Sequence, residues 1–235
     1  DGIKMSKRHG ATSVYEYKKM GYPAEAFKNY LARLGWNHEN QDYFSMEQAV
    51  KWFSIKSIGK SPSRFDIKKL DSISKYHIKT MPKNKLVSEL TQFSSEEKGL
   101  DLAKPQIEML KSSINLIRDR SRNYTELFEN AQFFIKTRPI KIQPDNLKIL
   151  NISTVKLLDR LTLQLRNVNW TTENIDETLN KFVQNEAIKF QEVAQPLRIA
   201  LIGERSSPSI AAVMYLLGKP ETIGRLEDIL FAKGK

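Results

Sequence analysis

The stretch TENIDETLNKFVQ, residues 172–184, carries its apolar side chains on one helix face. They recur three and four positions apart, which is the period of an amphipathic α-helix. These residues are Ile175, Leu179, Phe182 and Val183. Aliphatic and aromatic residues at this spacing form a protein core far more often than a ligand site. The stretch therefore predicts a helix that packs one face against neighbouring helices.

The helical period continues on both sides of this stretch. From about Lys83 onward, candidate helices lie near residues 83–92, 94–101, 105–121, 124–136, 144–150, 153–166, 172–184, 188–201, 208–217 and 220–232. The only short strand-like runs are residues 140–142 and 199–202. The sequence therefore predicts a mainly all-α fold, with a helical bundle over residues 81–235 that could divide near residues 140–150.

The first 80 residues predict shorter helices bounded by caps and glycines. In a capping box, a serine and a glutamate or glutamine three positions later each bond the other's backbone N–H. The pattern occurs at Ser13–Glu16, Ser45–Gln48 and Ser94–Glu97. Gly21 and Gly35 are expected to end helices, and residues 55–64 to form a loop. Thr80-Met81-Pro82 interrupts the pattern, which indicates a domain boundary near residues 79–83.

Composition narrows the class of protein. The 235 residues are 40% hydrophobic and 28% charged, which is enough for one large domain or two modest ones. The absence of cysteine excludes disulfides and thiolate metal sites, and the three histidines lack ligand spacing. No apolar run approaches the roughly 20 residues of a membrane span, and the polar N-terminus shows no signal-peptide pattern. A cytoplasmic protein without a membrane partner is the expectation.

The net charge indicates a polyanionic partner. The chain carries 38 Lys and Arg against 27 Asp and Glu, a formal net charge of +11. Residues 1–80 hold 15 cations and 8 anions, and residues 81–235 hold 23 and 19. Clustered Lys and Arg gain affinity for phosphates by releasing counterions, which makes a nucleic acid the favoured partner.

The pentapeptide KMSKR, residues 4–8, is the motif most suited to chemistry. Lys4 and Lys7 stand three positions apart, so two ammonium groups in one loop could bind the phosphates of a nucleotide together. Ser6 could anchor such a loop through a local hydrogen bond. Alone, the pentapeptide would more often be a solvated basic terminus than a catalytic loop. No catalytic triad, glycine-rich phosphate loop or helical metal-ligand pair accompanies it.

Four separated motifs give the chain a resemblance to glutamyl-tRNA synthetase, bacterial or organellar. They are KMSKRHGATSV with the following YEYKKMGYPAEAFKNYLARLGW, then SPSRFDIKKL (61–70), then VAQPLRIALIG (193–203), and finally SSPS (206–209) with LLGKPETIGRLEDIL (216–230). The resemblance covers essentially the whole chain, in order. It implies the C-terminal portion of a class I aminoacyl-tRNA synthetase. Residues 1–80 would then be the end of the catalytic core with a stem-contact fold, and residues 81–235 a helical anticodon-binding region.

The resemblance also implies chemistry and partners for the whole enzyme. Such an enzyme activates glutamate with ATP and Mg²⁺ and ligates it to tRNA(Glu), and a monomer is expected. The half that binds glutamate and most of the ATP has no counterpart in this sequence, so the chain alone is expected to be inactive. Whether tRNA(Gln) is also charged stays open.

Site residues carry over where the motifs match. Lys4, Met5, Ser6, Lys7 and Arg8 correspond to the ATP-binding loop, with Lys7 as the catalytic, transition-state-stabilising residue. Arg198, Ser207 and Ile210 correspond to anticodon contacts, and Arg120 to an arginine that reads the third anticodon base. Arg118 or Arg122 could be the true equivalent of Arg120.

The tRNA-binding assignments have structural alternatives. Arg64 is assigned to the tRNA backbone, although Asp66 could hold it as an ion pair. Arg198 could instead cap a helix or pair with Glu204, and Arg120 could be a solvated charge.

One departure from the family pattern is visible after RFDIKKL. A tryptophan-leucine-asparagine stretch is usual there, and residues 71–78 read DSISKYHI instead.

Two other interpretations of the whole chain remain. The chain could be a stand-alone helical RNA-binding or assembly module without a synthetase role. It could also derive from glutaminyl-tRNA synthetase, but the β-barrel anticodon region of that enzyme conflicts with the helical pattern.

Overall fold

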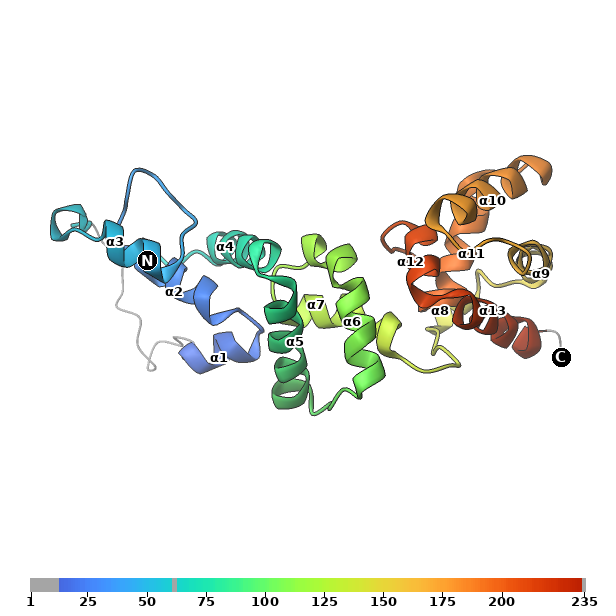
Figure 1. The fold of residues 1–235 in the computed structure, drawn as a ribbon, viewed down its shortest axis with the longest axis horizontal. Coiled ribbons are helices and arrows are strands. Elements are labelled where there is room, and N and C mark those ends of the chain that lie inside the picture. Colours follow the sequence, from blue (N-terminus) through green and yellow to red (C-terminus); the bar gives the residue numbers. More distant parts are fainter. Residues whose placement is uncertain (1–12, 61–62, 234–235) are drawn as a thin grey trace. The chain divides into compact units, whose positions relative to one another are not determined.

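The helices of this protein fall into two units, divided between residues 131 and 132. The computed structural model describes residues 13–60 and 63–233, with the side chain of residue 233 left out. Unit one covers residues 1–131 and unit two residues 132–235. Within the described residues no β-strand is present, and Trp36 and Ile58 form one isolated β-bridge. The mainly all-α prediction is therefore confirmed (Figure 1).

Unit one begins with short helices and continues with longer ones. Its elements are α1 (Val14–Lys19), α2 (Ala24–Gly35), α3 (Met46–Trp52), the 3-10 turn η2 (Ile55–Ser57), α4 (Ile67–Thr80), α5 (Lys83–Lys98), α6 (Lys104–Ile117), the 3-10 turn η3 (Arg118–Arg120) and the first part of α7 (Tyr124–Ile135). Helices α2 and α4 pack together, as do α5 and α6. The gap between α4 and α5 falls at Met81 and Pro82, where the sequence indicates a domain boundary. A domain division there stays a prediction.

The predicted caps have different outcomes. Ser13 caps α1 by accepting from the Glu16 N–H, and Ser45 with Gln48 forms a complete capping box on α3. The box predicted at Ser94 is wrong. Ser94 is buried within α5, and its hydroxyl donates to the Leu100 carbonyl at 2.7 Å. The two helices predicted at 83–92 and 94–101 are thus one helix, because the apolar face continues through Phe93.

The core of unit one joins the N-terminal helices to α4. Tyr17 of α1 stacks on Phe27 of α2 with ring centroids 4.8 Å apart, and Leu70 and Ile73 of α4 are fully buried in the same cluster. At the start of α7, Tyr124 and Phe128 are buried as well. These contacts fix α4 and the start of α7, the elements next to η3.

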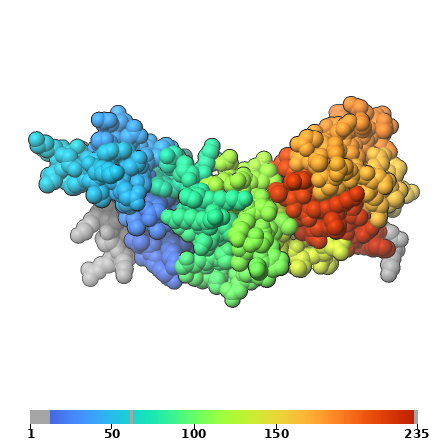
Figure 2. Space-filling view, viewed as in Figure 1, coloured from blue at the N-terminus to red at the C-terminus, as the bar shows by residue number. Residues whose placement is uncertain are grey.

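Unit two is a bundle of the C-terminal helices. Its elements are the end of α7, α8 (Pro144–Leu147), α9 (Ile152–Leu165), α10 (Thr172–Asn185), α11 (Phe190–Ile202), α12 (Ile210–Leu217) and α13 (Lys219–Lys233). Helix α13 packs on α9 and α11, and α12 lies against α10 and α13, so the orange and red surfaces adjoin on the face in Figure 2. Residues 199–202, one of the two strand-like runs, belong to α11.

The stretch at residues 172–184 forms α10, as its period predicts. Ile175, Leu179 and Phe182 are almost completely buried in the bundle. Phe133 and Phe134 are buried at the end of α7. No helix in the described part of the chain is long and apolar enough to cross a membrane.

Candidate nucleic-acid interface

Three arginines lie within five residues at η3, and the structure gives them different surroundings. Arg118 points inward. Its guanidinium donates to the carbonyl of Met81 at 2.6 Å and to that of Ile78, at the C-terminal end of α4. Burial lowers the pKa of Arg118. Arg118 therefore ties η3 to α4, and both of its Nη groups donate to the protein.

Arg122 is held by carboxylates. Its Nε donates to Glu126 at 2.8 Å, its Nη1 donates to Asp71 at 3.1 Å, and its backbone N–H also donates to Glu126. The hydrogen bond and charge of Glu126, followed by the charge of Asp71, raise the pKa of Arg122. Its carbonyl accepts from the buried Ser74 hydroxyl. Arg122 therefore anchors the C-terminal side of the η3 turn.

Arg120 lies between these two anchors and is exposed to solvent. No described residue forms an ion pair or a hydrogen bond with its side chain. A guanidinium offers a planar fork of donors that suits a base edge or a phosphate. Of the three arginines, only Arg120 has a guanidinium without a partner among the described residues. The turn that carries it is held in place by Arg118 on one side and by Arg122 on the other.

The loop between α11 and α12 brings two further predicted residues together. Arg198 is half-buried, and its Nε donates to the Ser207 Oγ at 3.1 Å. The Ser207 hydroxyl donates in turn to the Pro208 carbonyl at 2.7 Å. Ile210 begins α12 and is only 3% exposed, so its side chain belongs to the core. A contact of Ile210 with RNA could therefore use only its backbone.

Arg64 is exposed in the loop just before α4, and the ion pair proposed as its alternative is absent. The Asp66 carboxylate instead caps α4, accepting from the N–H groups of Lys68 at 2.9 Å and Lys69 at 3.3 Å. No described residue pairs with the Arg64 guanidinium. The side chain is thus available to a phosphate.

Helix α4 also carries a row of cations that the site assignment from the sequence does not include. Lys68, Lys75 and Lys79 are exposed, and none forms an ion pair with a described residue. Beside them the rings of Tyr43 and Tyr76 stack at 4.4 Å, and both are more than a third exposed. The spacing of the lysines is visible in the sequence, but their shared exposure depends on how α4 packs.

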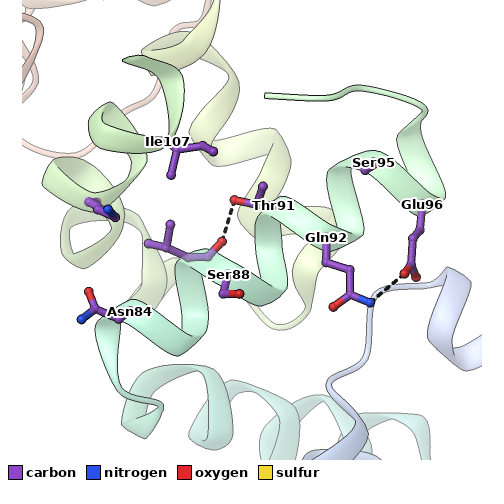
Figure 3. A pocket seen from close by; sticks show the side chains of 9 residues that line it. Asn84, Ser88, Thr91, Gln92, Ser95, Glu96 and Ile107 are labelled. Atoms are coloured by element: carbon purple, nitrogen blue, oxygen red, sulfur yellow. Dashed lines mark hydrogen bonds between the residues drawn. The ribbon is translucent and has the colours of Figure 1, made fainter. Parts of the chain in front are cut away.

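Residues 4–8, which include every predicted ATP-binding residue, lie outside the described part of the chain. Elsewhere, the hollow on α5 and α6 in Figure 3 has a volume of about 520 Å³ and is lined mainly by uncharged polar side chains. Within it Gln92 donates to Glu96, and Thr91 donates to the Val87 carbonyl. In the described residues no group of three or more His, Asp or Glu side chains could hold a metal ion. The cationic turns are therefore the candidate site.

A helical protein with cationic turns of this kind is suited to a polyanion such as RNA. Comparison with known proteins gives the family. Residues 85–230 match the family described as anticodon binding domain, and residues 1–72 match the class I tRNA synthetase (E and Q) catalytic domain. The chain belongs to the anticodon-binding-domain family, and its resemblance to glutamyl-tRNA synthetases is confirmed.

Individual relatives agree with the family match. The chain is 41% identical to glutamate–tRNA ligase 2 of Ruegeria pomeroyi over 97% of its length, and 39% identical to glutamate–tRNA ligase 1 of Cereibacter sphaeroides over 97%. It covers 49% and 48% of these two proteins, so it spans about half the length of its curated relatives. A glutamate tRNA ligase structure from Elizabethkingia meningosepticum shares the fold, with a TM-score of 0.79 at 23% identity, covering 97% of this chain and 48% of that one.

Proposed function

We propose that this chain is the tRNA-recognising part of a glutamate–tRNA ligase that acts in the cytoplasm as a monomer on tRNA(Glu). The observation that carries the proposal is the η3 turn, where Arg118 and Arg122 are engaged with the protein and Arg120 is exposed without a partner among the described residues. Anticodon bases are unstacked and accessible, so a fixed guanidinium can reach their edges. Arg198 and Ser207 would supply a second anticodon contact in unit two. The backbone of Ile210 would lie next to it.

The cations of unit one would bind the tRNA backbone. Arg64 and the three α4 lysines are exposed and unpaired among the described residues. The Asp42 carboxylate of the same unit is neutralised by Lys69 and by Arg33, which is 2.9 Å away, and Lys69 is the main cause of its lowered pKa. The residual positive charge favours phosphates, which position a nucleic acid without reading its sequence.

Binding of this chain to tRNA(Glu) and to an anticodon-swapped variant, at one fixed salt concentration, tests the proposal. Tighter binding to tRNA(Glu) is expected, because base contacts add to a backbone attraction that both RNAs share. Equal affinity for the two would remove the anticodon-reading role and leave a non-selective RNA-binding module.

In the whole enzyme, Lys4 and Lys7 would bind the ATP phosphates with Met5, Ser6 and Arg8, and Lys7 would stabilise the charge that develops in the transition state. ATP with Mg²⁺ would supply the adenylyl group that activates glutamate, with pyrophosphate as the leaving group. Since the counterpart of the glutamate-binding half is missing from this sequence, we expect the isolated chain to catalyse no glutamate-dependent ATP–pyrophosphate exchange. Exchange above a no-enzyme blank, in a preparation free of host ligase, would contradict this expectation.

A further inference from the structure

The loop that joins α11 to α12 is held in place by contacts with the segment around α8. Gly203 has a φ of +82°, and a Cβ at that position would lie 3.1 Å from the Lys141 carbonyl oxygen. Asn146 is only 8% exposed, and its amide nitrogen donates to the Gly203 carbonyl at 2.8 Å. The start of the loop is therefore fixed by a buried side chain from a distant part of the sequence.

The same buried amide holds an arginine of the loop. Nε of Arg205 donates to the Asn146 carbonyl oxygen at 2.7 Å, and Nη2 of Arg205 donates to the Asp145 backbone carbonyl at 3.1 Å. Arg205 is nevertheless exposed. A guanidinium has five N–H donors, and two of them are used here. The other three form no further hydrogen bond with a described residue.

Holding a guanidinium in advance removes much of the ordering cost that a long, flexible side chain meets on binding. Arg205 is two residues from Ser207, which bonds Arg198, so the loop brings two guanidiniums into one neighbourhood. Two carboxylates lie near. Asp145 is paired with Lys148 at 2.7 Å, and Glu204 is exposed next to Arg205 in the chain. Lys141 is exposed on the segment around α8. Cations outnumber anions around the loop.

From these contacts we infer that Arg205 is a further RNA-binding residue, which takes a backbone phosphate, and that Asn146 is its positioning residue. The inference rests on the proposed function, since it places a phosphate beside the anticodon contact of Arg198. A phosphate suits Arg205 because the unused N–H donors of this guanidinium face solvent and carry a positive charge in a fixed position. Most protein contacts with nucleic acids also go to the backbone. Arg198, half-buried against Ser207, is left to contact a base.

The test measures the dissociation constants of tRNA(Glu) and the anticodon-swapped tRNA over a range of salt concentrations. Arg205→Gln should weaken both complexes by the same factor, roughly tenfold, and reduce the salt slope by about one. Arg205→Lys should keep the salt slope and recover part of the affinity, because the charge remains and the fork is lost. As the control, Lys181→Gln removes an exposed cation of α10 and should leave affinity and slope nearly unchanged.

The positioning role of Asn146 is tested by a double-mutant cycle. Asn146→Ala should weaken binding by a larger factor in the parent chain than in the Arg205→Gln background, because part of its effect passes through Arg205 and part through Gly203. A melting curve of each variant confirms folding. If Asn146→Ala does not fold, the two Arg205 variants still decide the RNA contact.

Three results would overturn the inference. An unchanged affinity and salt slope in Arg205→Gln would remove the contact, while the parent chain's preference for tRNA(Glu) would leave the proposed function intact. A loss confined to tRNA(Glu) would show that Arg205 reads a base and not a phosphate. Additive effects of the Asn146 and Arg205 variants would remove the positioning role. Failure of the proposed function itself is separate, because the parent chain would then not distinguish the two tRNAs.

Discussion

Gly21 is a position where two distant segments meet at backbone distance. Its carbonyl accepts from the Tyr124 N–H at 2.7 Å, and the Thr125 hydroxyl donates to the Met20 carbonyl at 3.0 Å. Its φ is +88°, a conformation that costs residues with a Cβ about 1–2 kcal/mol. A Cβ would also lie 2.6 Å from the Thr125 backbone nitrogen. The end of α1 and the start of α7 are joined here because residue 21 has no side chain.

We predict that Gly21→Ala destabilises unit one more than Gly99→Ala does. Gly99 has a φ of +63°, but nothing lies within 4 Å of its hypothetical Cβ, so only the backbone strain of about 1 kcal/mol applies. At Gly21 the contact with backbone adds to that strain, which gives a loss of about 2–3 kcal/mol. Urea unfolding of both variants measures the difference. Equal losses would show that the approach to Thr125 relaxes at no cost.

His77 gives unit one a dependence on pH. It lies partly buried on α4, with Nε2 3.0 Å from Oδ1 of Asn29. That oxygen also accepts from the Phe44 N–H, so Nε2 is the donor. Burial is the main cause that lowers the pKa of His77 from 6.5, and Lys85 lowers it further while Glu25 opposes the shift. The folded state therefore favours the neutral imidazole.

The unfolded chain binds a proton at His77 more readily than the folded chain does. The stability that His77 contributes is then fully present above pH 6.5 and is lost as the pH falls through the lowered folded-state pKa. We predict that His77→Gln, which cannot titrate, flattens the decline in the free energy of unfolding between about pH 7 and pH 5. An equally steep decline in the variant would show that other groups cause it.

At the scale of elements, one buried guanidinium connects several helix ends in unit two. Arg225 of α13 is 2% exposed. It donates to the carbonyls of Phe133 and Lys136 at the end of α7 and to that of Leu201 at the end of α11, at 2.6–3.2 Å. Glu221, one turn earlier, accepts from its Nε at 2.7 Å. These carbonyls have no intrahelical partner, so Arg225 satisfies helix ends that would otherwise be buried unpaired.

We predict that Arg225→Met destabilises unit two by about 3–5 kcal/mol, because it leaves buried carbonyls and a carboxylate without their donor. The matched change Arg166→Met removes a surface ion pair with Glu227, and the Arg166 side chain is 50% exposed. Its cost should stay below about 1 kcal/mol. Thermal or urea unfolding provides the comparison. A small effect of Arg225→Met would mean that these carbonyls reach water.

Most helices could be predicted from the sequence because their apolar periods and caps are local. The apolar period at residues 172–184 was sufficient to predict the helix α10, and Pro144 marks the start of α8. Ser94 shows the limit of such patterns, since a serine three positions before a glutamate also occurs inside a helix whose apolar face continues. A cap depends on where the neighbouring apolar residues pack, which is not local information.

The candidate site was only partly predictable for the same reason. Arg118, Arg120 and Arg122 cannot be ranked from their spacing, because the contacts that distinguish them are distant in sequence. Arg118 donates to the carbonyls of Ile78 and Met81, and Arg122 donates to Asp71. Arg205 was missed because its partner, Asn146, is 59 positions away. Family motifs indicated the loop that carries Arg198 and Ser207, but the core position of Ile210 required the structure.

At the scale of the whole molecule, exposed cations are present in both units. Unit one carries Arg64, Arg120 and the lysines of α4, and unit two carries Arg205 beside Arg198. With a formal net charge of +11, binding to RNA should depend strongly on salt. Affinity alone therefore says little about recognition, and the selective contacts must be separated from the general attraction.

The most direct test compares the preference for tRNA(Glu) over a variant with a changed third anticodon base in the parent chain, Arg120→Gln and Lys79→Gln. We predict that Arg120→Gln reduces this preference by about 1–3 kcal/mol, roughly five- to 150-fold, because it removes the proposed base contact. Lys79→Gln should weaken both complexes equally. If Arg120→Gln keeps the full preference of the parent chain, the central claim that the η3 turn reads the anticodon is contradicted.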